Sequence, residues 1–580
     1  MQPELVWPGV HVVLRLPSGS HSVHEIKPNT TISVGKYGSF QSNFLIGRPY
    51  HYTYEIIDQV DGSPPSGLRI VPPAELYADI KDEEPSKPVD LEEGEQADIN
   101  GKEVPAQFEI VDQKGEVLLR TNRDIVDDAR SQTMTMEEIE MLKAEGKGSG
   151  RDLIAKILDS HSALDQKTAF ALAKYTLRKT KKYLRRFTVL PMDVPLLTRW
   201  MMTEKDALKT MELREETLAL VGSWSNVHFM PSQLEEHPKQ PGNIGQGRWL
   251  MVDETGGLLV AAAAERLGIL HPPNEQENRP LATHPNRPFD VQPTGDMQLT
   301  PENPPDSQPK SNKRRFSIAK SNTITIVHAN SQPNLSLLRY FNFDAANPAP
   351  SHPLSHHLRT LSWLQLLHPE DDNACTEPEN IAPEVIQTWK SGKRSNHYRK
   401  RRRWERTVAV VSDTRLGNFD GLVVVSSLSL PPVLHHLVPL LHGAAQVVVY
   451  SPSIEPLVEL ADFYSTQRRV AYLNDPPAPE AMPTVDFPVN PTLLLAPTVQ
   501  TISCRPWQVL PGRTHPLMTG KGGSEGYVFT ATRVLPAEGG VEARGISKKR
   551  KDKLEDVGRD ESESRREKVV KAKDEEIMDS

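Results

Sequence analysis

Runs of β-branched and apolar residues alternate with helix-forming segments over the second half of the chain, and this alternation constrains the fold more than any other feature. The first run, Trp249–Asp253, is followed by an alanine-rich helical segment, Gly257–Arg266. Such alternation is typical of a parallel sheet whose strands are joined by crossover helices. We therefore predict an α/β domain. Further strands are predicted at Thr323–Val327, Thr407–Val411, Leu422–Val425 and Gln446–Tyr450. A helix is expected after each of the last three. Antiparallel strands are predicted within Thr492–Val534.

The first seventy residues contain short strands separated by glycine and proline. Strands are predicted at Val10–Leu16, Thr31–Val34 and Tyr50–Val60, a pattern that favours a small β-barrel or sandwich. Between Glu75 and Asp98, ten acidic residues stand against two lysines. A segment of this charge lacks the apolar surface needed to fold. We predict an N-terminal β-barrel domain over residues 1–130, with an acidic insert at about 75–105.

Helical periodicity begins near residue 131. Thr135 can cap a helix with two glutamates in its first turn, a second helix is predicted over Asp152–His161, and Lys167–Phe187 is strongly basic. Ten of the chain's 50 prolines fall within residues 271–310, where they exclude regular elements. The predicted organisation is a helical, basic connecting region at 131–190, the two parts of the α/β domain at 191–267 and 321–546, a disordered proline-rich insert at 268–320, and a disordered charged tail at 547–580.

Charge and cysteine content exclude several classes of protein. The formal net charge of −8 excludes a uniformly basic nucleic-acid binder, and two cysteines among 580 residues exclude a disulfide framework or a cysteine-rich metal site. The histidine pairs His356–His357 and His435–His436 are poor chelators, because adjacent side chains point apart. Apolar runs are too short to span a bilayer. These features predict a soluble intracellular protein without a metal site and without membrane contact.

The predicted parallel sheet lacks the residues that normally hold a nucleotide-type cofactor. Its first turn, Asp253–Gly257, has an adjacent glycine pair in place of the spaced glycines of a cofactor loop. No acidic residue lies between Ser321 and Phe343, where a ribose anchor is expected, and none lies between Gly421 and Ile454. These absences favour a structural α/β domain that binds no cofactor.

Three basic clusters are the positive signals. Lys174–Arg186 carries seven cationic residues and two tyrosines, which favours contact with RNA phosphates and unpaired bases over a solvated or acid-paired helix. Lys393–Arg403, placed just before a predicted strand, is either a phosphate-binding arm or a nuclear-import signal. Lys548–Lys551 opens the tail and suits an import signal better than a binding face.

The chain resembles a known family, the non-catalytic subunits of the eukaryotic tRNA (adenine-N1)-methyltransferase that modifies adenine 58. The resemblance spans roughly residues 10–535 in the family's order. The combination of segments is specific, although no single segment is. The matching segments are Asn122–Asp128, Ser131–Gln132, Lys167–Thr168, Lys174–Tyr175, Gly256–Val260, Glu265–Arg266, Phe419–Leu422, Val448–Tyr450, Glu455–Leu457, Trp507–Pro516 and Gly526–Tyr527.

The resemblance implies a small N-terminal β-barrel followed by a degenerate Rossmann-like methyltransferase domain, α+β and α/β in class. It implies no catalytic residues and no cofactor in this chain, with S-adenosylmethionine in a catalytic partner subunit, a heterotetramer, tRNA as ligand and a nuclear location. Ser426–Ser427 stands where the catalytic subunit has an aspartate. Together with the basic run, the implied tRNA-binding residues are Asn122, Arg123, Asp124, Asp127, Asp128, Arg130, Ser131, Gln132, Lys174, Tyr175, Arg178, Lys179, Lys181, Lys182, Tyr183, Arg185, Arg186, Gln508, Leu510, Arg513, Thr514, His515, Pro516, Gly526 and Tyr527.

Two other functions are compatible with these features. One is an active methyltransferase with a divergent cofactor loop, which methyl transfer by the isolated chain would support. The other is an RNA-binding scaffold or translation factor without a methyltransferase partner. Co-purification with a subunit that has an intact glycine-rich loop would separate this last class from the non-catalytic subunit. Arg513 and His515 are expected in a loop after a strand, where they can contact tRNA backbone.

Overall fold

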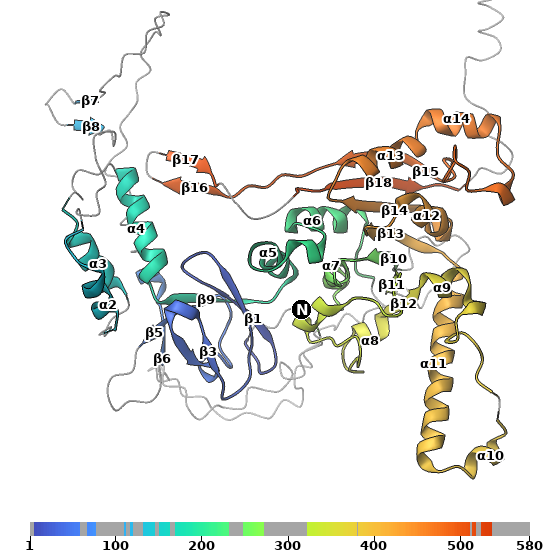
Figure 1. The fold of residues 1–580 in the computed structure, drawn as a ribbon, viewed down its shortest axis with the longest axis horizontal. Helices are drawn as coiled ribbons and strands as arrows, with labels where there is room; N and C mark the ends of the chain where they lie inside the picture. The colour runs from blue at the N-terminus through green and yellow to red at the C-terminus, as the bar shows by residue number, and fades with distance from the viewer. Residues whose placement is uncertain are drawn as a thin grey trace, which may run out of the picture. The chain divides into compact units, whose positions relative to one another are not determined.

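The protein is described by a computed structural model (Figure 1). The structure describes residues 5–57, 67–76, 110–111, 117–119, 132–144, 150–162, 169–230, 247–271, 322–379, 381–510, 513–517 and 524–535. The predicted acidic insert, the charged tail and Asn122–Ser131 therefore lie largely or wholly outside the described residues. Most of the predicted proline-rich insert does so too.

The N-terminal strands form a five-stranded antiparallel sheet (Figure 1). A separate two-stranded sheet joins β3 (Thr31–Ser33) to β4 (Ser39–Gln41). The apolar core beneath them includes Leu14, Phe40 and Phe187, the last two with stacked rings 4.8 Å apart. This is an all-β unit, but a closed barrel is not confirmed. The order of the five strands is β2 (His21–Glu25), β1 (His11–Arg15), β9 (Arg186–Pro191), β5 (Thr53–Ile57) and β6 (Gly67–Ile70).

The central strand of that sheet, β9, comes from the end of the region that the sequence indicated as helical and basic. Every residue of β9 is buried, and the strand pairs with β1 on one side and β5 on the other. The basic run therefore changes from helix to strand, with Tyr183 ending the helix and Phe187 inside the sheet. A long-range pairing of this kind leaves no local signal, because its partners lie more than a hundred residues earlier.

The helices α2 (Met136–Ala144), α3 (Arg151–Asp159) and α4 (Ala169–Tyr183) lie ahead of β9 in the chain. The predicted cap of α2 is confirmed. The Thr135 hydroxyl accepts from the Glu138 amide at 3.2 Å, and the Glu138 carboxylate accepts from the Thr135 amide at 2.9 Å, the reciprocal bonding of a capping box. Ile154 and Ile157 of α3 pack with Tyr183 in a small apolar cluster. Two short strands, β7 (Ile110–Val111) and β8 (Val117–Leu119), form a pair of their own.

The second half of the chain forms a seven-stranded sheet (Figure 1). Its first five strands are parallel, and the last two are antiparallel to their neighbours. Chain order reverses between β10 and β13, which is the topology of a doubly wound α/β fold. The strand order is β12 (Leu358–Ser362), β11 (Thr323–His328), β10 (Arg248–Asp253), β13 (Phe419–Val425), β14 (Leu441–Ser451), β18 (Tyr527–Arg533) and β15 (Leu494–Gln500).

Helices cover both faces of this sheet. In β10, Trp249 and Met251 join one apolar cluster while Leu250 and Val252 join the other, as the twofold alternation of a strand requires. The first cluster contains residues of α5 (Val194–Glu204), α6 (Glu215–Trp224) and α7 (Leu258–Arg266). The second contains residues of α9 (Trp363–Leu367), α12 (Leu430–Leu437) and α13 (Glu455–Phe463). Further helices are α8 (Leu354–His357), α10 (Pro383–Gln387) and α14 (Thr466–Asn474).

The predicted strand at Thr407–Val411 is wrong, because these residues belong to the 25-residue helix α11 (Ser391–Arg415). The β-branched residues favour a strand locally. However, the two buried positions, Val411 and Thr414, are three residues apart, the spacing of a helix face. No glycine or proline separates them from the basic run. The cluster Lys393–Arg403 therefore lies inside a helix and does not precede a strand.

The antiparallel arrangement predicted for Thr492–Val534 is confirmed. Beyond β15 and β18, it includes a hairpin of β16 (Trp507–Leu510) and β17 (Arg513–Pro516). Within the part of the chain that the structure describes, no helix combines the length and apolarity needed to cross a membrane.

Candidate nucleic-acid interface

Helix α4 carries four of its five cationic side chains on one face. Lys174, Arg178, Lys181 and Lys182 follow one another at i, i+4, i+7 and i+8, which places them on the same side of a helix with 3.6 residues per turn. Arg178, Lys181 and Lys182 are exposed, and Lys174 is half-buried. The opposite side ends in Tyr183, which is 8 % exposed and packs against α3. The predicted basic helix therefore has one buried side and one side that gathers positive charge.

Lys179 and Tyr175 occupy the border between these two sides. The Lys179 Nζ lies 4.8 Å from the centre of the Tyr175 ring, a cation–π distance. Burial lowers the pKa of Lys179, and the charges of Lys182 and Arg178 lower it further. Cations this close to one another raise the local positive potential, which is the condition that favours binding of a polyanion.

Gln132 is fixed beside α4. Its side-chain amide donates to the Ser160 hydroxyl at 2.5 Å, and its carbonyl oxygen accepts from the Tyr175 hydroxyl at 3.2 Å. The Tyr175 ring meets the buried His161 edge-on at 5.1 Å. Two of the segments predicted to contact tRNA, around Gln132 and along α4, are thus brought together in the structure. Asn122, Arg123, Asp124, Asp127, Asp128, Arg130 and Ser131 lie outside the described residues.

The C-terminal end of α4 is anchored to the N-terminal sheet domain. The Tyr37 hydroxyl donates to the Lys181 carbonyl at 2.6 Å, and the Arg185 Nε donates to the Tyr37 carbonyl at 3.1 Å. These reciprocal contacts satisfy a carbonyl near the helix end, where intrahelical partners run out. Arg185 was predicted to contact tRNA, and the structure shows it holding the helix in place.

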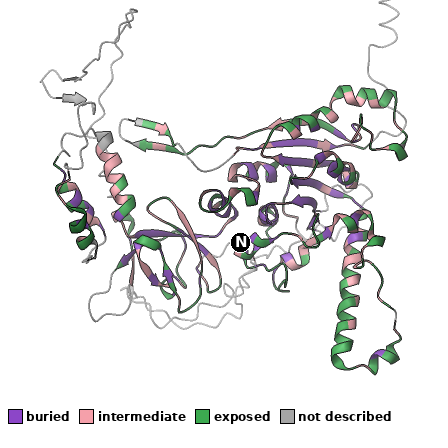
Figure 2. Cartoon of the chain, viewed as in Figure 1, coloured by how far each residue is buried: buried purple, intermediate pink, exposed green. Residues whose placement is uncertain are grey.

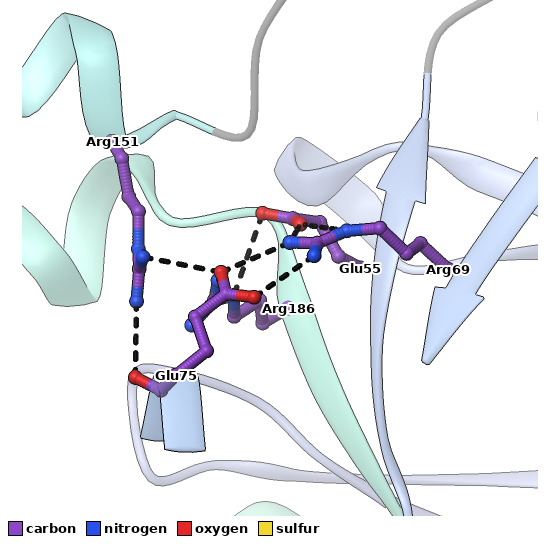
Figure 3. Close-up of polar contacts among 5 residues, drawn as sticks. All are labelled: Glu55, Arg69, Glu75, Arg151 and Arg186. Atoms are coloured by element: carbon purple, nitrogen blue, oxygen red, sulfur yellow. Dashed lines mark hydrogen bonds and ion pairs between the residues drawn. The ribbon is translucent and has the colours of Figure 1, made fainter. Parts of the chain in front are cut away.

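Arg186 lies in an ion-pair network beneath α4 (Figure 3). Its side chain is 4 % exposed and contacts the carboxylates of Glu55, at 3.4 Å, and Glu75. Arg69 donates to the same two glutamates, from Nε to Glu55 at 2.9 Å and from Nη1 to Glu75 at 2.8 Å. Arg151, the first residue of α3, pairs with Glu75 at 3.1 Å. The network therefore joins β5, β6, β9 and α3.

The pKa values in this network follow from its hydrogen bonds. The bond from Arg69 and the nearby charges of Arg186 and Arg151 lower the pKa of Glu75 to about 2. The bonds to Glu75 and Glu55 raise the pKa of Arg69. Arg186 is thus paired with two carboxylates inside the protein, and we do not include it in the candidate tRNA surface. From the sequence alone, it was predicted to bind tRNA in the same way as its exposed neighbours.

The hairpin of β16 and β17 lies against α4, which β16 contacts. Gln508 and His515 face each other in register, and Thr514 and Pro516 are exposed. Arg513 and His515 lie in strand β17, not in the loop that the sequence suggested. The side chains of Leu510 and Arg513 are outside the described residues. A third predicted segment thus joins the first two.

Two exposed apolar side chains of this hairpin were not predicted from the sequence as binding residues. Trp507 is 60 % exposed and Val509 is 73 % exposed. They alternate with Gln508 and so point to the same face of a two-stranded ribbon, where no second layer covers them in the described part of the chain (Figure 2). The alternation Trp-Gln-Val-Leu was the available signal. An exposed indole of this kind can stack on an unpaired base.

Tyr527 is the first residue of β18 in the seven-stranded sheet, and Gly526 directly precedes that strand. Gly526 has φ +74°, and a Cβ there would stand 2.3 Å from the Tyr450 ring. Tyr527 is half-buried and packs on an apolar cluster of the sheet. The structure therefore gives both residues a packing role.

The turn where a cofactor loop would stand is closed by hydrogen bonds. Burial raises the pKa of the Asp253 carboxyl, which accepts from the Thr255 amide at 2.7 Å, the Thr255 hydroxyl at 2.5 Å and the Val260 amide at 3.2 Å. The Glu254 carboxylate accepts from both the amide and the hydroxyl of Ser427 at 2.7 Å. The ends of β10 and β13 are thus tied to each other at the point where chain order reverses.

The glycine pair of the same turn faces leucines of the 3₁₀ helix η7 (Ser336–Phe341) and the residue before it. Gly257 has φ +93°, and a Cβ there would stand 3.2 Å from the Leu335 Cα and 3.3 Å from the Leu338 Cγ. The Gly256 carbonyl accepts from the Leu337 amide at 3.0 Å. In a cofactor loop the glycines let a ligand approach the backbone. Here they let the protein's own chain approach it.

Comparisons with known proteins place the chain among relatives. The model of the Gcd10p family matches residues 5–390. The chain is 48 % identical to the tRNA (adenine(58)-N(1))-methyltransferase non-catalytic subunit trm6 of Aspergillus fumigatus, covering 94 % of this chain and 95 % of that protein. It is 45 % identical to the trm6 subunit of Aspergillus oryzae, covering 95 % and 96 %. A solved structure of the tRNA (m1A58) methyltransferase TrmI from Aquifex aeolicus is similar at 9 % identity and TM-score 0.33, covering 92 % of this chain and 100 % of that chain.

A family match over about two thirds of the chain, with relatives of 48 % and 45 % identity that cover 94 % and 95 % of it, shows the family. The chain belongs to the Gcd10p family and is a homologue of the non-catalytic subunit of tRNA (adenine58-N1)-methyltransferase.

Proposed function

We propose that this chain binds tRNA and positions it for a catalytic subunit that carries S-adenosylmethionine. The observation that supports this most directly is the cationic face of α4, with Arg178, Lys181 and Lys182 exposed and the β16–β17 hairpin beside it. Phosphate contacts of this kind fix the register of a nucleic acid without reading its sequence. Such a role requires no catalytic residue in the chain. It also requires a second kind of subunit, and we propose a heterotetramer of the two.

The mechanism that we propose divides the work between the subunits. Adenine 58 must leave its stack before a methyl group can reach N1, and unstacking costs a few kcal/mol. We propose that binding energy gained elsewhere on the tRNA meets part of that cost. The cationic face of α4 supplies part of it through phosphates. The hairpin, with its exposed Trp507, supplies another part by stacking.

The test is charge removal on α4 in the assembled complex. We expect Arg178→Gln, Lys181→Gln and Lys182→Gln together to weaken tRNA binding and to lower the slope of log K against log salt by about 2 to 3, since each phosphate contact contributes about 0.7 to 0.9. Assembly with the catalytic subunit should survive. The matched control removes three exposed lysines elsewhere, Lys27, Lys205 and Lys209. Equal salt slopes for the two triple variants would refute the assignment of this face.

We also propose that the chain is nuclear. The support is the basic cluster Lys548–Lys551 in the tail, because the other cluster, Lys393–Arg403, is built into helix α11. Replacing the four tail residues by alanine in a fluorescent fusion should move the protein out of the nucleus. Unchanged nuclear accumulation would contradict this.

A further inference from the structure

Helix α11 has two halves with different surroundings. Its C-terminal half is fixed to the α/β domain: Val411 and Thr414 are buried, and the Asp413 carboxylate pairs with Arg248 at 2.7 Å and with Arg359. The Trp404 indole donates to the Cys375 carbonyl at 3.0 Å. The N-terminal half is exposed on most of its positions (Figure 2). The fixed half therefore holds a long, exposed helical arm in a defined place on the domain.

Four arginines form a stripe along this arm. Arg399, Arg402, Arg403 and Arg406 are all exposed and follow one another at i, i+3, i+4 and i+7, so that they share one helix face. At a rise of 1.5 Å per residue the stripe is about 10 Å long. Glu405 is the one acidic residue between Ser391 and Ser412, and its carboxylate is bonded to Arg401 at 3.4 Å. We call these four residues the arginine stripe.

The stripe does not have the pattern of an ordinary solvated helix face. Exposed helices usually carry opposite charges at i and i+4, which stabilise them, whereas like charges at these spacings destabilise a helix. Arg399 and Arg403 form one such like-charge pair, and Arg402 and Arg406 form another. A polyanion removes this repulsion when it binds, and the release of its counterions adds to the affinity. Charge complementarity thus identifies the partner.

We propose that the arginine stripe is a second RNA-backbone site, which binds successive phosphates of the tRNA at a place distinct from the face of α4. Guanidinium groups suit this task because they bind phosphate oxygens with two parallel hydrogen bonds. The stripe makes no base-specific contact, so it adds affinity without sequence preference. The proposal rests on the proposed function, in that the RNA is the tRNA of the assembled complex.

The competing explanation of the cluster is a signal read by a protein import receptor. The structure favours RNA, because the arginines are arranged on one face of a helix whose C-terminal half is anchored in the domain. The arrangement on one face matters for a row of phosphates. A short linear signal needs only its composition.

The experiment uses two quadruple variants of the stripe in the complex with the catalytic subunit. In one, all four arginines become glutamine, and in the other they become lysine. Arginine, lysine and glutamine have similar helix propensities, so α11 should form in both. Fluorescence anisotropy with labelled tRNA is measured over a series of salt concentrations. We expect the glutamine variant to lose about 3 from the salt slope and to bind tRNA about tenfold or more weakly near 0.1 M salt. The lysine variant should keep the slope.

Three outcomes decide the matter. A glutamine variant with the salt slope of the unaltered complex overturns the proposal, as does a loss of nuclear accumulation by that variant with tRNA affinity intact. A lysine variant that loses the slope as fully as the glutamine variant also overturns it, since the charge would then not be the cause.

The α4 triple variant separates this inference from the proposed function. If only the α4 variant changes the slope, the stripe proposal fails alone. If neither does, the proposed function fails as well.

Discussion

The buried network under α4 makes a quantitative prediction. Glu55→Gln keeps the size of the side chain and removes one of the two carboxylates that face three arginines in Figure 3. The Glu55 side chain is 3 % exposed and the Arg186 side chain is 4 % exposed, so water cannot replace the lost partner. Removing one member of a buried ion pair costs about 3 to 5 kcal/mol, because the other charge stays buried without it. Glu75 still pairs with Arg186, which places the expected loss at the lower end, about 3 kcal/mol.

Hydrogen exchange in the folded protein measures that loss where it occurs. The network joins β9 to β5, β6 and α3, so exchange of the β9 amides reports the opening of this part of the structure. A loss of 3 kcal/mol corresponds to exchange about 150-fold faster. The amides of β13, in the other sheet, serve as the internal control. If β9 and β13 amides keep the same protection in the variant as in the unaltered chain, the network does not hold the sheet and the reasoning is wrong.

Four further predictions follow from the structure. Because the folded pKa of Glu75, about 2, lies below its ordinary value of 4.5, its stabilisation is present above pH 4.5 and is lost as the pH falls toward 2; Glu75→Gln should remove that part of an acid unfolding curve. The hydrogen bond that the His442 Nε2 donates to the Asp420 carboxylate, at 2.7 Å, raises the pKa of His442 above 6.5. The contribution of His442 to stability is therefore complete below pH 6.5 and is lost as the pH rises through the folded value. In His442→Gln the melting temperature should vary less with pH over that range, and an unchanged slope of melting temperature against pH would contradict this. Gly257→Ala should destabilise the α/β domain by about 1 to 3 kcal/mol, because φ is +93° and Leu335 is in the way, whereas Gly392→Ala, with open space around it, should not. Calorimetric titration of S-adenosylmethionine into the chain should give no binding heat while tRNA still binds; saturable heat would favour the active-enzyme alternative.

The sequence was sufficient where the signal is local. The run Trp249–Asp253 and the alanine-rich helix after it appear in the structure within a residue of their predicted bounds, since burial on both faces of a parallel strand selects continuous apolar residues. The cap at Thr135 was predictable for the same reason. The first strand of the N-terminal sheet was as well.

The sequence was insufficient where a distant partner decides. In sequence, Arg185 and Arg186 resemble the cations before them. In the structure, however, they donate hydrogen bonds to Tyr37 and Glu55, which lie more than a hundred residues earlier. Thr407–Val411 has the composition of a strand, and only its packing against the sheet domain makes it the anchored end of a helix. No local pattern contains these facts, because each depends on what the rest of the chain brings alongside.

These two kinds of cation also explain how one basic run can serve two purposes. The exposed lysines of α4 can bind a polyanion only if the helix is held against the repulsion of its own charges. Two arginines just after the helix hold it there, since Arg185 donates to the Tyr37 carbonyl and Arg186 pairs with Glu55 and Glu75. A variant that removes Lys181 and Lys182 should therefore weaken tRNA binding at unchanged stability, whereas Glu55→Gln should lower both. The pair of measurements separates the side chains that contact tRNA from those that position them.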